Sequence, residues 1–202
     1  MNCFERSIYE KVGAENYEKI SGAVIGIIGC GGLGSNAAVC LARSGFKNFI
    51  LMDFDKIEYG NLNRQYYFFG DVGRFKAEVL RERLISINPS VEAKVFIQKL
   101  NDENIEFFSK ADAVVEAVDT AETKADIVSF GAKKGILTVS SSGMAGYGDA
   151  KDMTVKKIGG VYVTGDMKSG ISDTMHPYAP KVSAAAALEA DIILAHFMGC
   201  DI

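Results

Sequence analysis

The sequence has no tryptophan, only three prolines and only two histidines among its 202 residues. It also has no long apolar run, because the hydrophobic stretch at residues 23–28 suits a strand and gives way to glycines. A membrane-spanning helix needs about 20 apolar residues, so we expect no membrane association. The first residues lack the basic and then apolar order of a secretory signal.

Cysteine is equally sparse, and its four positions are widely separated: Cys3, Cys30, Cys40 and Cys200. Without a Cys-x-x-Cys pair, the pattern favours neither a structural zinc site nor a disulfide framework. We therefore expect a cytoplasmic protein without zinc. Cys30 lies inside a glycine cluster, where we interpret it as a small buried residue rather than a reactive thiol.

Excess positive charge is also absent. The net charge is −4 at pH 7, and the lysines and arginines are scattered along the chain. Proteins that bind nucleic acid usually carry a basic face, so we expect no nucleic-acid partner. The hydrophobic fraction of 48% and the charged fraction of 24% are typical of a globular protein, and the length fits one domain.

Strand and helix patterns alternate through the first two thirds of the chain. Strands are predicted at residues 23–28, 49–52, 91–97, 113–118 and 136–139. Helices are predicted at residues 4–20, 35–44, 74–87, 102–108 and 121–134. This order predicts an α/β protein with a Rossmann-like, doubly wound and mainly parallel sheet, preceded by an N-terminal helix.

Glycines become frequent beyond residue 140. Two short β-prone segments, at residues 153–157 and 161–164, predict an antiparallel extension of the sheet. We expect a loop at residues 165–180 and a final alanine-rich helix at residues 183–198. In that loop and helix, His176 and His196 are interpreted as a surface residue and a structural residue.

A G-x-G-x-x-G motif, formed by Gly29, Gly31 and Gly34, lies between the first predicted strand and the helix that follows it. Such a turn lets phosphates approach the backbone at the N-terminus of the helix. Asp53 ends the next strand, about 20 residues further on, where an acid usually binds a ribose hydroxyl. The motif predicts nucleotide binding without separating NAD or FAD from ATP.

Polar residues next to this motif favour ATP chemistry. Arg64 lies in a loop after Asp53, Lys76 opens the following helix, and Asp119 ends a later strand. A carboxylate that attacks the α-phosphate of ATP meets repulsion, which a cation at about 4 Å offsets by about 4 kcal/mol at an effective dielectric of 20. Arg64 and Lys76 are candidate catalytic cations, and Asp119 is a candidate magnesium ligand. A carboxylate is already ionised at neutral pH, so no base is required.

The combined pattern resembles the adenylyltransferase domain of the ubiquitin-activating superfamily, and within it the ThiF/MoeB type. The likeness rests on the glycine motif, Asp53 and Asp55, the Asn-Leu-Asn-Arg-Gln string at residues 61–65, Gly73 with Lys76, and Asp119. It extends over about residues 6–182. It implies that residues 1–202 form one ThiF-like domain that uses ATP and Mg²⁺.

The resemblance implies a role for each matching residue. The nucleotide would lie on the glycine turn, formed by Gly29, Gly31, Gly32 and Gly34. Asp53 would bind the ribose, Asn61 and Arg64 the phosphates, Lys76 the phosphates through the transfer, and Asp119 the magnesium ion. Arg6 matches an arginine that the family lends across a homodimer interface, although an exposed helix charge is an equal alternative.

The chain also departs from the family pattern. Fuller bacterial members carry two Cys-x-x-Cys pairs for zinc, which makes this chain similar to the short, zinc-free type. Residues 143–181 contain no cysteine for a covalent step, and Thr120 stands where the family has asparagine. Lys124 and Lys181 are interpreted as solvated charges.

The expected reaction is adenylylation of the C-terminal glycine carboxylate of a ubiquitin-like, ThiS-like sulfur carrier, in thiamine thiazole biosynthesis. Alternatives are a MoaD-like carrier for molybdopterin, a tRNA-modifying activity, a carrier-binding module without catalysis, and an NAD-dependent oxidoreductase. An oxidoreductase would leave Arg64, Lys76 and Asp119 unexplained.

Overall fold

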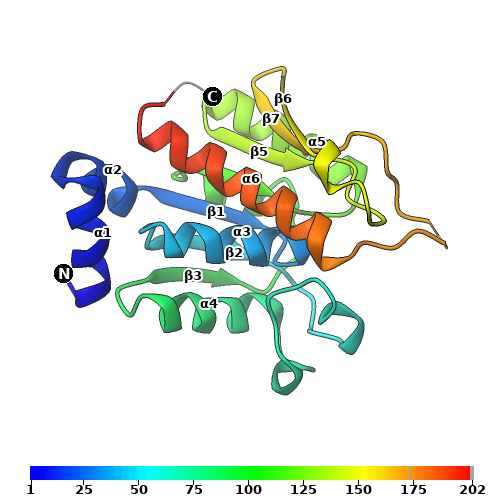
Figure 1. Ribbon diagram of the computed structural model, residues 1–202, viewed down its shortest axis with the longest axis horizontal. Coiled ribbons are helices and arrows are strands. Elements are labelled where there is room, and N and C mark those ends of the chain that lie inside the picture. Colours follow the sequence, from blue (N-terminus) through cyan, green and yellow to red (C-terminus); the bar gives the residue numbers. More distant parts are fainter. Residues whose placement is uncertain (173, 201–202) are drawn as a thin grey trace.

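The computed structural model describes residues 1–172 and 174–200, and within this part of the chain a seven-stranded sheet forms the centre of the molecule (Figure 1). Its strands lie in the order β3-β2-β1-β4-β5-β7-β6. Neighbouring strands are parallel except for the β6–β7 pair at one edge. The strands are β1 (Val24–Ile28), β2 (Asn48–Met52), β3 (Glu92–Phe96), β4 (Ala113–Glu116), β5 (Leu137–Ser141), β6 (Thr154–Ile158) and β7 (Val161–Gly165).

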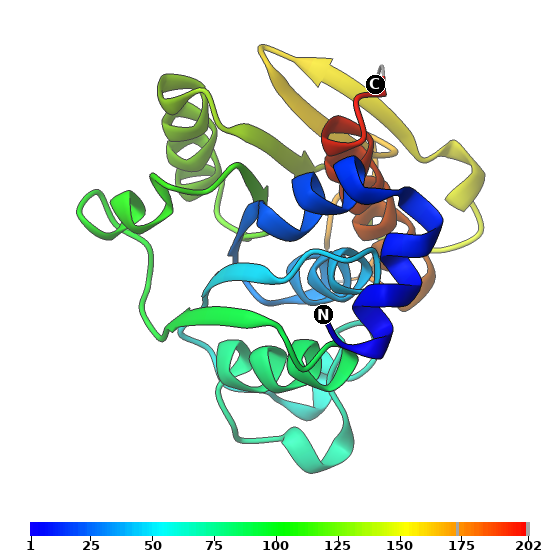
Figure 2. The same ribbon diagram turned by 90° about the vertical axis from the view of Figure 1, so that its left-hand side faces the viewer.

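Helices cover both faces of the sheet, as Figure 2 shows. The helices of the described residues are α1 (Cys3–Val12), α2 (Ala14–Gly22), α3 (Gly32–Arg43), α4 (Lys76–Ile87), α5 (Ala121–Lys134) and α6 (Ala179–Phe197). One core lies between the sheet and helices α3, α4 and α6. The other lies between the opposite face, α5 and the short 3-10 helix Asn104–Phe108. The prediction of a doubly wound α/β fold with an antiparallel C-terminal extension is confirmed.

Alternation of side chains along the strands explains the two cores. In β4, Ala113 and Val115 belong to the core under α3, whereas Val114 points into the core under α5. Successive side chains of a strand point to opposite faces, so a strand that is apolar throughout can bury both faces. The sheet therefore needs helices on both sides, and its ligand-binding edge lies where the parallel strands end.

Several predicted boundaries are wrong, each for a local reason. The helix predicted at residues 4–20 is two helices, because Gly13 has φ +81° and turns the chain between α1 and α2. Helix α6 begins at Ala179, since Pro180 lies in its first turn, where the missing N–H costs no hydrogen bond. The predicted loop to residue 180 therefore extended too far. The predicted helix at 121–134 coincides with α5.

No helix in the described ranges has the length and hydropathy needed to cross a membrane.

The glycine motif lets α3 pack directly on β1. A Cβ atom at Gly34 would overlap the Gly29 carbonyl oxygen, and one at Gly29 would lie 2.5 Å from the Ala117 carbonyl oxygen. Gly29 also has φ +92°, which L side chains rarely adopt. The close approach of strand and helix therefore requires glycine at both positions.

We expect Gly34→Ala to lower the free energy of unfolding by about 1–3 kcal/mol, since the added methyl group overpacks the strand–helix contact. Urea denaturation followed by circular dichroism would measure the change. The matched control is Gly22→Ala at the end of α2, where an added Cβ meets no atom within 4 Å. The control should leave stability unchanged or raise it by about 0.4–1 kcal/mol. Equal losses at both positions would contradict this account.

Candidate functional site: a cavity at the strand ends

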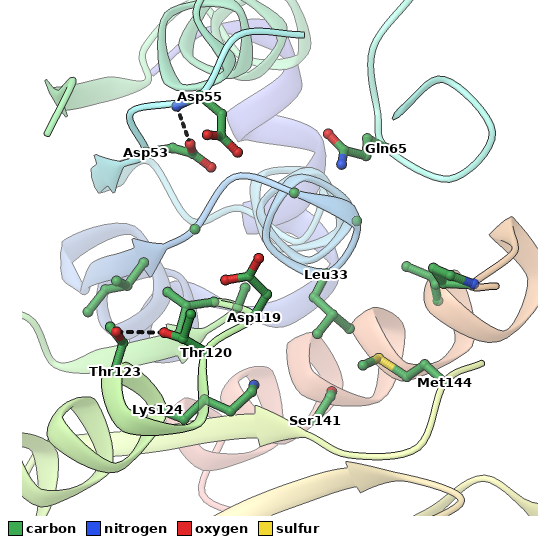
Figure 3. A pocket seen from close by; sticks show the side chains of 18 of the residues that line it. Leu33, Asp53, Asp55, Gln65, Asp119, Thr120, Thr123, Lys124, Ser141 and Met144 are labelled. Atoms are coloured by element: carbon green, nitrogen blue, oxygen red, sulfur yellow. Dashed lines mark hydrogen bonds between the residues drawn. The ribbon is translucent and has the colours of Figure 1, made fainter. Parts of the chain in front are cut away.

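A cavity of about 880 Å³ opens at the carboxyl ends of the parallel strands. Its walls come from the loops that follow β1, β2, β3, β4, β5 and β7. In Figure 3, Asp53 and Asp55 lie on one side, Ser141 and Met144 on the other, and Asp119 between them. This volume lies within the range of about 300–1,000 Å³ that is usual for ligand sites. We call the side of Asp53 the nucleotide wall and the side of residues 141–145 and 169–171 the acceptor wall.

The glycine turn presents backbone N–H groups to the cavity. Helix α3 begins at Gly32, directly after Gly31, and none of the described side chains caps its N-terminus. Gly29, Gly31, Gly32 and Leu33 all line the cavity. An uncapped helix N-terminus has unpaired N–H donors and a partial positive charge, which together favour an anion such as a phosphate.

Asp53 fixes this turn in place. One carboxylate oxygen accepts the N–H of Cys30 at 2.7 Å, and the other accepts the N–H of Asp55 at 2.8 Å. Burial raises the pKa of Asp53, while these two hydrogen bonds counter that effect. Asp53 lines the cavity, and each carboxylate oxygen has acceptor capacity beyond the one hydrogen bond it makes, so the group can still accept hydrogen bonds from ligand hydroxyls.

The two candidate cations lie on the same wall. Lys76 is buried at the start of α4, and its ammonium group lies 2.7 Å from an Asp55 carboxylate oxygen. Arg64 is half-buried and donates to the Gly60 carbonyl at 3.2 Å and to the Asn63 side chain at 2.8 Å. Both residues line the cavity, and burial lowers the pKa of Arg64.

Asn61 and Asp119 complete the residues that the structure brings to the cavity. The Asn61 side-chain oxygen accepts the N–H of Glu58 at 3.0 Å, which leaves its amide N–H donors for a ligand. Asp119 is exposed just past the end of β4. The described residues contain no group of three acidic, histidine or cysteine side chains that could hold a metal unaided. A single carboxylate still suits Mg²⁺, which commonly binds one or two carboxylates together with substrate phosphates.

Two of the predicted residues do not line the cavity. Gly34 lies one turn inside α3, where it supports the glycine turn by close packing. Arg6 is exposed on α1 and does not line the cavity; α1 lies beside the end of the sheet opposite to the one where the parallel strands end (Figure 1). Cys30 is fully buried, and burial raises the pKa of its thiol well above the usual value, so a small buried residue is the correct interpretation.

The interpretation of Lys124 and Lys181 as solvated charges is wrong. Lys124 lines the cavity, and its ammonium group contacts both Glu116 carboxylate oxygens, at 2.8 and 3.0 Å. Glu116 is fully buried at the end of β4 and also accepts the Ser140 hydroxyl at 2.5 Å. Lys181 is buried among acceptors at the start of α6. The one signal in the sequence was the charge of Glu116 within an otherwise apolar strand.

A second buried carboxylate escaped the sequence reasoning. Glu189 on α6 is fully buried and accepts the Ser141 hydroxyl at 2.7 Å. Burial raises its pKa to about 8, and the nearby charge of Glu116 acts in the same direction. Ser141 lines the cavity, so this carboxyl group lies directly behind the acceptor wall.

Comparisons with known proteins identify a family to which the chain is similar. The model of the ThiF family matches residues 4–187. The tRNA threonylcarbamoyladenosine dehydratase of Bacillus subtilis is 34% identical over 137 residues, which are 66% of this chain and 54% of that protein. The sulfur carrier protein ThiS adenylyltransferase of Escherichia coli is 30% identical over 129 residues, 63% of this chain and 51% of that protein. The chain thus spans about half the length of the curated relatives it matches.

Solved structures show the same architecture. The E. coli tRNA N6-threonylcarbamoyladenosine dehydratase TcdA, in complex with ATP, has a TM-score of 0.87 at 22% identity, covering 96% of this chain and 93% of that one. E. coli MccB with ATP has a TM-score of 0.73 at 26% identity, covering 98% of this chain and 64% of that one. The likeness to TcdA, at this identity, concerns the fold.

The buried Glu189 predicts a pH dependence of stability. Its pKa of about 8 in the folded state lies above the ordinary value of 4.5, so the folded protein holds a proton that the unfolded chain has released between these values. The stabilisation is complete below the lower value and is lost as the pH rises through the upper one, at about 1.4 kcal/mol per pH unit.

Urea denaturation at several pH values between about 5 and about 9 would measure this slope. Glu189→Gln should make the decline of unfolding free energy with pH shallower, while it keeps the acceptor for Ser141. Asp191→Asn, at an exposed position of the same helix, is the control and should leave the slope unchanged. An unchanged slope in Glu189→Gln would show that this carboxyl group is not the titrating one.

Proposed function

The chain belongs to the ThiF family, and from this premise we propose that it transfers the adenylyl group of ATP to a carboxylate. The observation that carries the proposal is the meeting of three kinds of group in one cavity. These are the uncapped N-terminus of α3, the cations Arg64 and Lys76, and a separate acceptor wall without charged side chains at residues 141–145. A polyphosphate fits the first two kinds of group, and an uncharged chain end fits the third.

The reaction needs little from the protein beyond positioning and charge. A carboxylate oxygen attacks the α-phosphorus of ATP, and the bond from that phosphorus to the oxygen of the β-phosphate breaks. Pyrophosphate leaves with the electron pair. The attacking carboxylate is already ionised at neutral pH, so no proton has to be removed. The task of the site is to offset the repulsion between the two anions.

Arg64 and Lys76 are placed to do this. Positively charged donors that are held in place stabilise the charge that develops on the transferring phosphate. The ammonium group of Lys76 lies 2.7 Å from an Asp55 carboxylate oxygen. When phosphates enter, this group would bind them in place of Asp55 or together with it. Asp53 would accept ribose hydroxyls and Asn61 would donate to the phosphates. Asp119 suits Mg²⁺, which would neutralise phosphate charge when bound.

For the acceptor, we propose the C-terminal glycine carboxylate of a ThiS-like carrier in thiamine thiazole biosynthesis. The likeness to the E. coli ThiS adenylyltransferase supports this choice. Ser142, Gly143 and Gly170 line the acceptor wall with small uncharged groups, which leaves room for a narrow chain end. A MoaD-like carrier would present the same chemistry.

A tRNA-linked carboxylate is the second candidate, because the likeness to tRNA threonylcarbamoyladenosine dehydratases is at least as strong. The net charge of −4 favours a protein acceptor instead, since tRNA binding depends on neutralising phosphates with many cations. The two acceptors can be offered separately, so the assay that tests adenylyl transfer also decides between them.

The first test is pyrophosphate–ATP exchange with purified protein, Mg²⁺, and either a ThiS-like carrier ending in Gly-Gly or tRNA. We expect exchange that depends on the intact carrier tail. Lys76→Met should lower the rate by about 10²–10³-fold, because it removes a preorganised charge from the developing anion. Lys19→Met is the matched control, since Lys19 lies on α2 away from the cavity, where it pairs with exposed Glu15.

Three results would count against this proposal in different ways. Exchange that tRNA supports and the carrier does not would replace the acceptor. Tight ATP binding without exchange for any acceptor would leave a binding module without catalysis. Binding of NAD in preference to ATP would point to an oxidoreductase.

We further propose that the protein acts as a homodimer in which Arg6 reaches the nucleotide of the other subunit. Two observations support this proposal: Arg6 is exposed on α1 and does not line the cavity of its own chain, and it matches an arginine that the family lends to the ATP of the other subunit. Arg6→Ala and Lys76→Met should each lose exchange activity when alone.

Mixing these two variants would then test the transfer of Arg6 between subunits. A mixed dimer has one site with both Lys76 and the neighbouring Arg6, so activity should return on mixing. Mixing each variant with itself is the control. Failure to regain activity, although mixed dimers form, would assign Arg6 to an ordinary surface charge.

A further inference from the structure

Lys181 carries a charge that is almost completely removed from water. Its side chain is 1% exposed, and its ammonium group lies 2.6 Å from an Asp166 carboxylate oxygen and 2.7 Å from the Ala145 carbonyl oxygen. The Ser169 hydroxyl at 3.2 Å and an Asp149 carboxylate oxygen at 3.0 Å complete its surroundings. An ammonium group has three protons, so these acceptors saturate it.

The partners of Lys181 come from two loops that are far apart in sequence. Ala145 and Asp149 follow β5, whereas Asp166 and Ser169 follow β7. Asp166 also accepts the N–H groups of residues 168 and 169, each at 2.8 Å, and the Ser169 hydroxyl at 2.7 Å. The ammonium group therefore ties both loops to the first turn of α6.

These two loops make up the acceptor wall. Ala145 and Ser169 line the cavity themselves, together with their neighbours at residues 141–144 and 170–171. Val182, the residue after Lys181, also lines the cavity and packs so close to Gly32 that a Cβ there would lie 2.8 Å from it. The start of α6 thus touches the glycine turn on one side and holds the acceptor wall on the other.

A role in stability alone does not account for this arrangement. A buried ion pair usually contributes less than apolar residues of the same size would, because both charges lose their hydration. Burial opposes ionisation of Asp166, but its hydrogen bonds from Lys181 and Ser169 outweigh burial and hold its pKa well below the usual range. What directed bonds add over apolar packing is one fixed conformation of the loops that they join.

We propose that Lys181 is a positioning residue, which holds the acceptor wall at a fixed place relative to the phosphate-binding turn and so sets the productive approach of the acceptor carboxylate. The inference rests on the adenylyl transfer proposed above. Lys181 does not line the cavity, so we expect it to act through the wall rather than by direct contact with ATP or the acceptor. Its removal should therefore impair use of the acceptor while it spares nucleotide binding.

The test compares Lys181→Met with the double variant Lys181→Met/Asp166→Asn, which leaves no unpaired charge at position 166 and guards against misfolding. Lys157→Met, on the exposed edge strand β6, is the matched control. In the pyrophosphate exchange assay, the KM for the carrier should rise about tenfold or more in both test variants, because a displaced wall no longer aligns the reacting atoms. The Kd for ATP, measured by calorimetry, should stay unchanged.

Amide hydrogen exchange supplies a readout that needs no acceptor and no turnover. Peptides that cover residues 143–149 and 165–171 should exchange faster in both test variants, while peptides from β1 and β2 keep their protection. Unchanged exchange in the two loops would refute the anchoring role whatever the enzyme does.

The kinetic results separate this inference from the proposed function. If the KM for the carrier is unchanged in the test variants, or if they lose ATP binding to the same extent, Lys181 contributes to stability only and does not position the acceptor. No pyrophosphate exchange by the unaltered protein with any acceptor would overturn adenylyl transfer, and with it the positioning of an acceptor.

Discussion

The nucleotide wall depends on the Asp53 carboxylate, which joins the two loops that follow β1 and β2. One oxygen holds the glycine turn through Cys30, and the other holds the next loop through Asp55. Asp55 in turn binds the ammonium group of Lys76 at the start of α4. The turn, the acidic loop and the cation are thus connected by consecutive hydrogen bonds. A site built in this way is preorganised, because a shift of any one part would break a hydrogen bond to the next.

The acceptor wall is likewise held in place by hydrogen bonds to carboxyl groups, which here come from other residues. Behind it lie three buried carboxyl groups: Glu116 paired with Lys124, Asp166 paired with Lys181, and Glu189, which accepts the Ser141 hydroxyl. Glu189 forms no ion pair with any of the described residues, and burial raises its pKa to about 8. The pattern follows from electrostatics, since a buried carboxyl group either finds a counter-charge or holds its proton.

How far the sequence predicts this protein depends on how local each interaction is. The glycine motif, Asp53 and Lys76 are close in the chain and tied to strand and helix ends, so periodicity and spacing suffice to place them at one edge. The break between α1 and α2 at Gly13 and the start of α6 at Ala179 each depend on the backbone conformation of one or two residues. The periodicity of apolar residues does not encode these conformations. The pairing of Lys181 with Asp166 depends on how β7 and α6 pack, and a single lysine in a polar segment gives no sign of it. Lys124 was misread for the same reason, although Glu116 in an apolar strand marked the place.

The charges of the cavity also bear on what must enter with a nucleotide. Asp53, Asp55 and Asp119 line it together with four cations, Arg64, Lys76, Lys99 and Lys124, of which Lys76 and Lys124 are already paired with carboxylates. A polyphosphate would therefore enter a site in which two of the four lining cations already have a carboxylate partner. Two additions would supply further positive charge: a divalent cation at Asp119, and an arginine from a second subunit. The proposed roles of Mg²⁺ and of Arg6 from a second subunit thus have the same electrostatic effect, because each would add positive charge beside the phosphates.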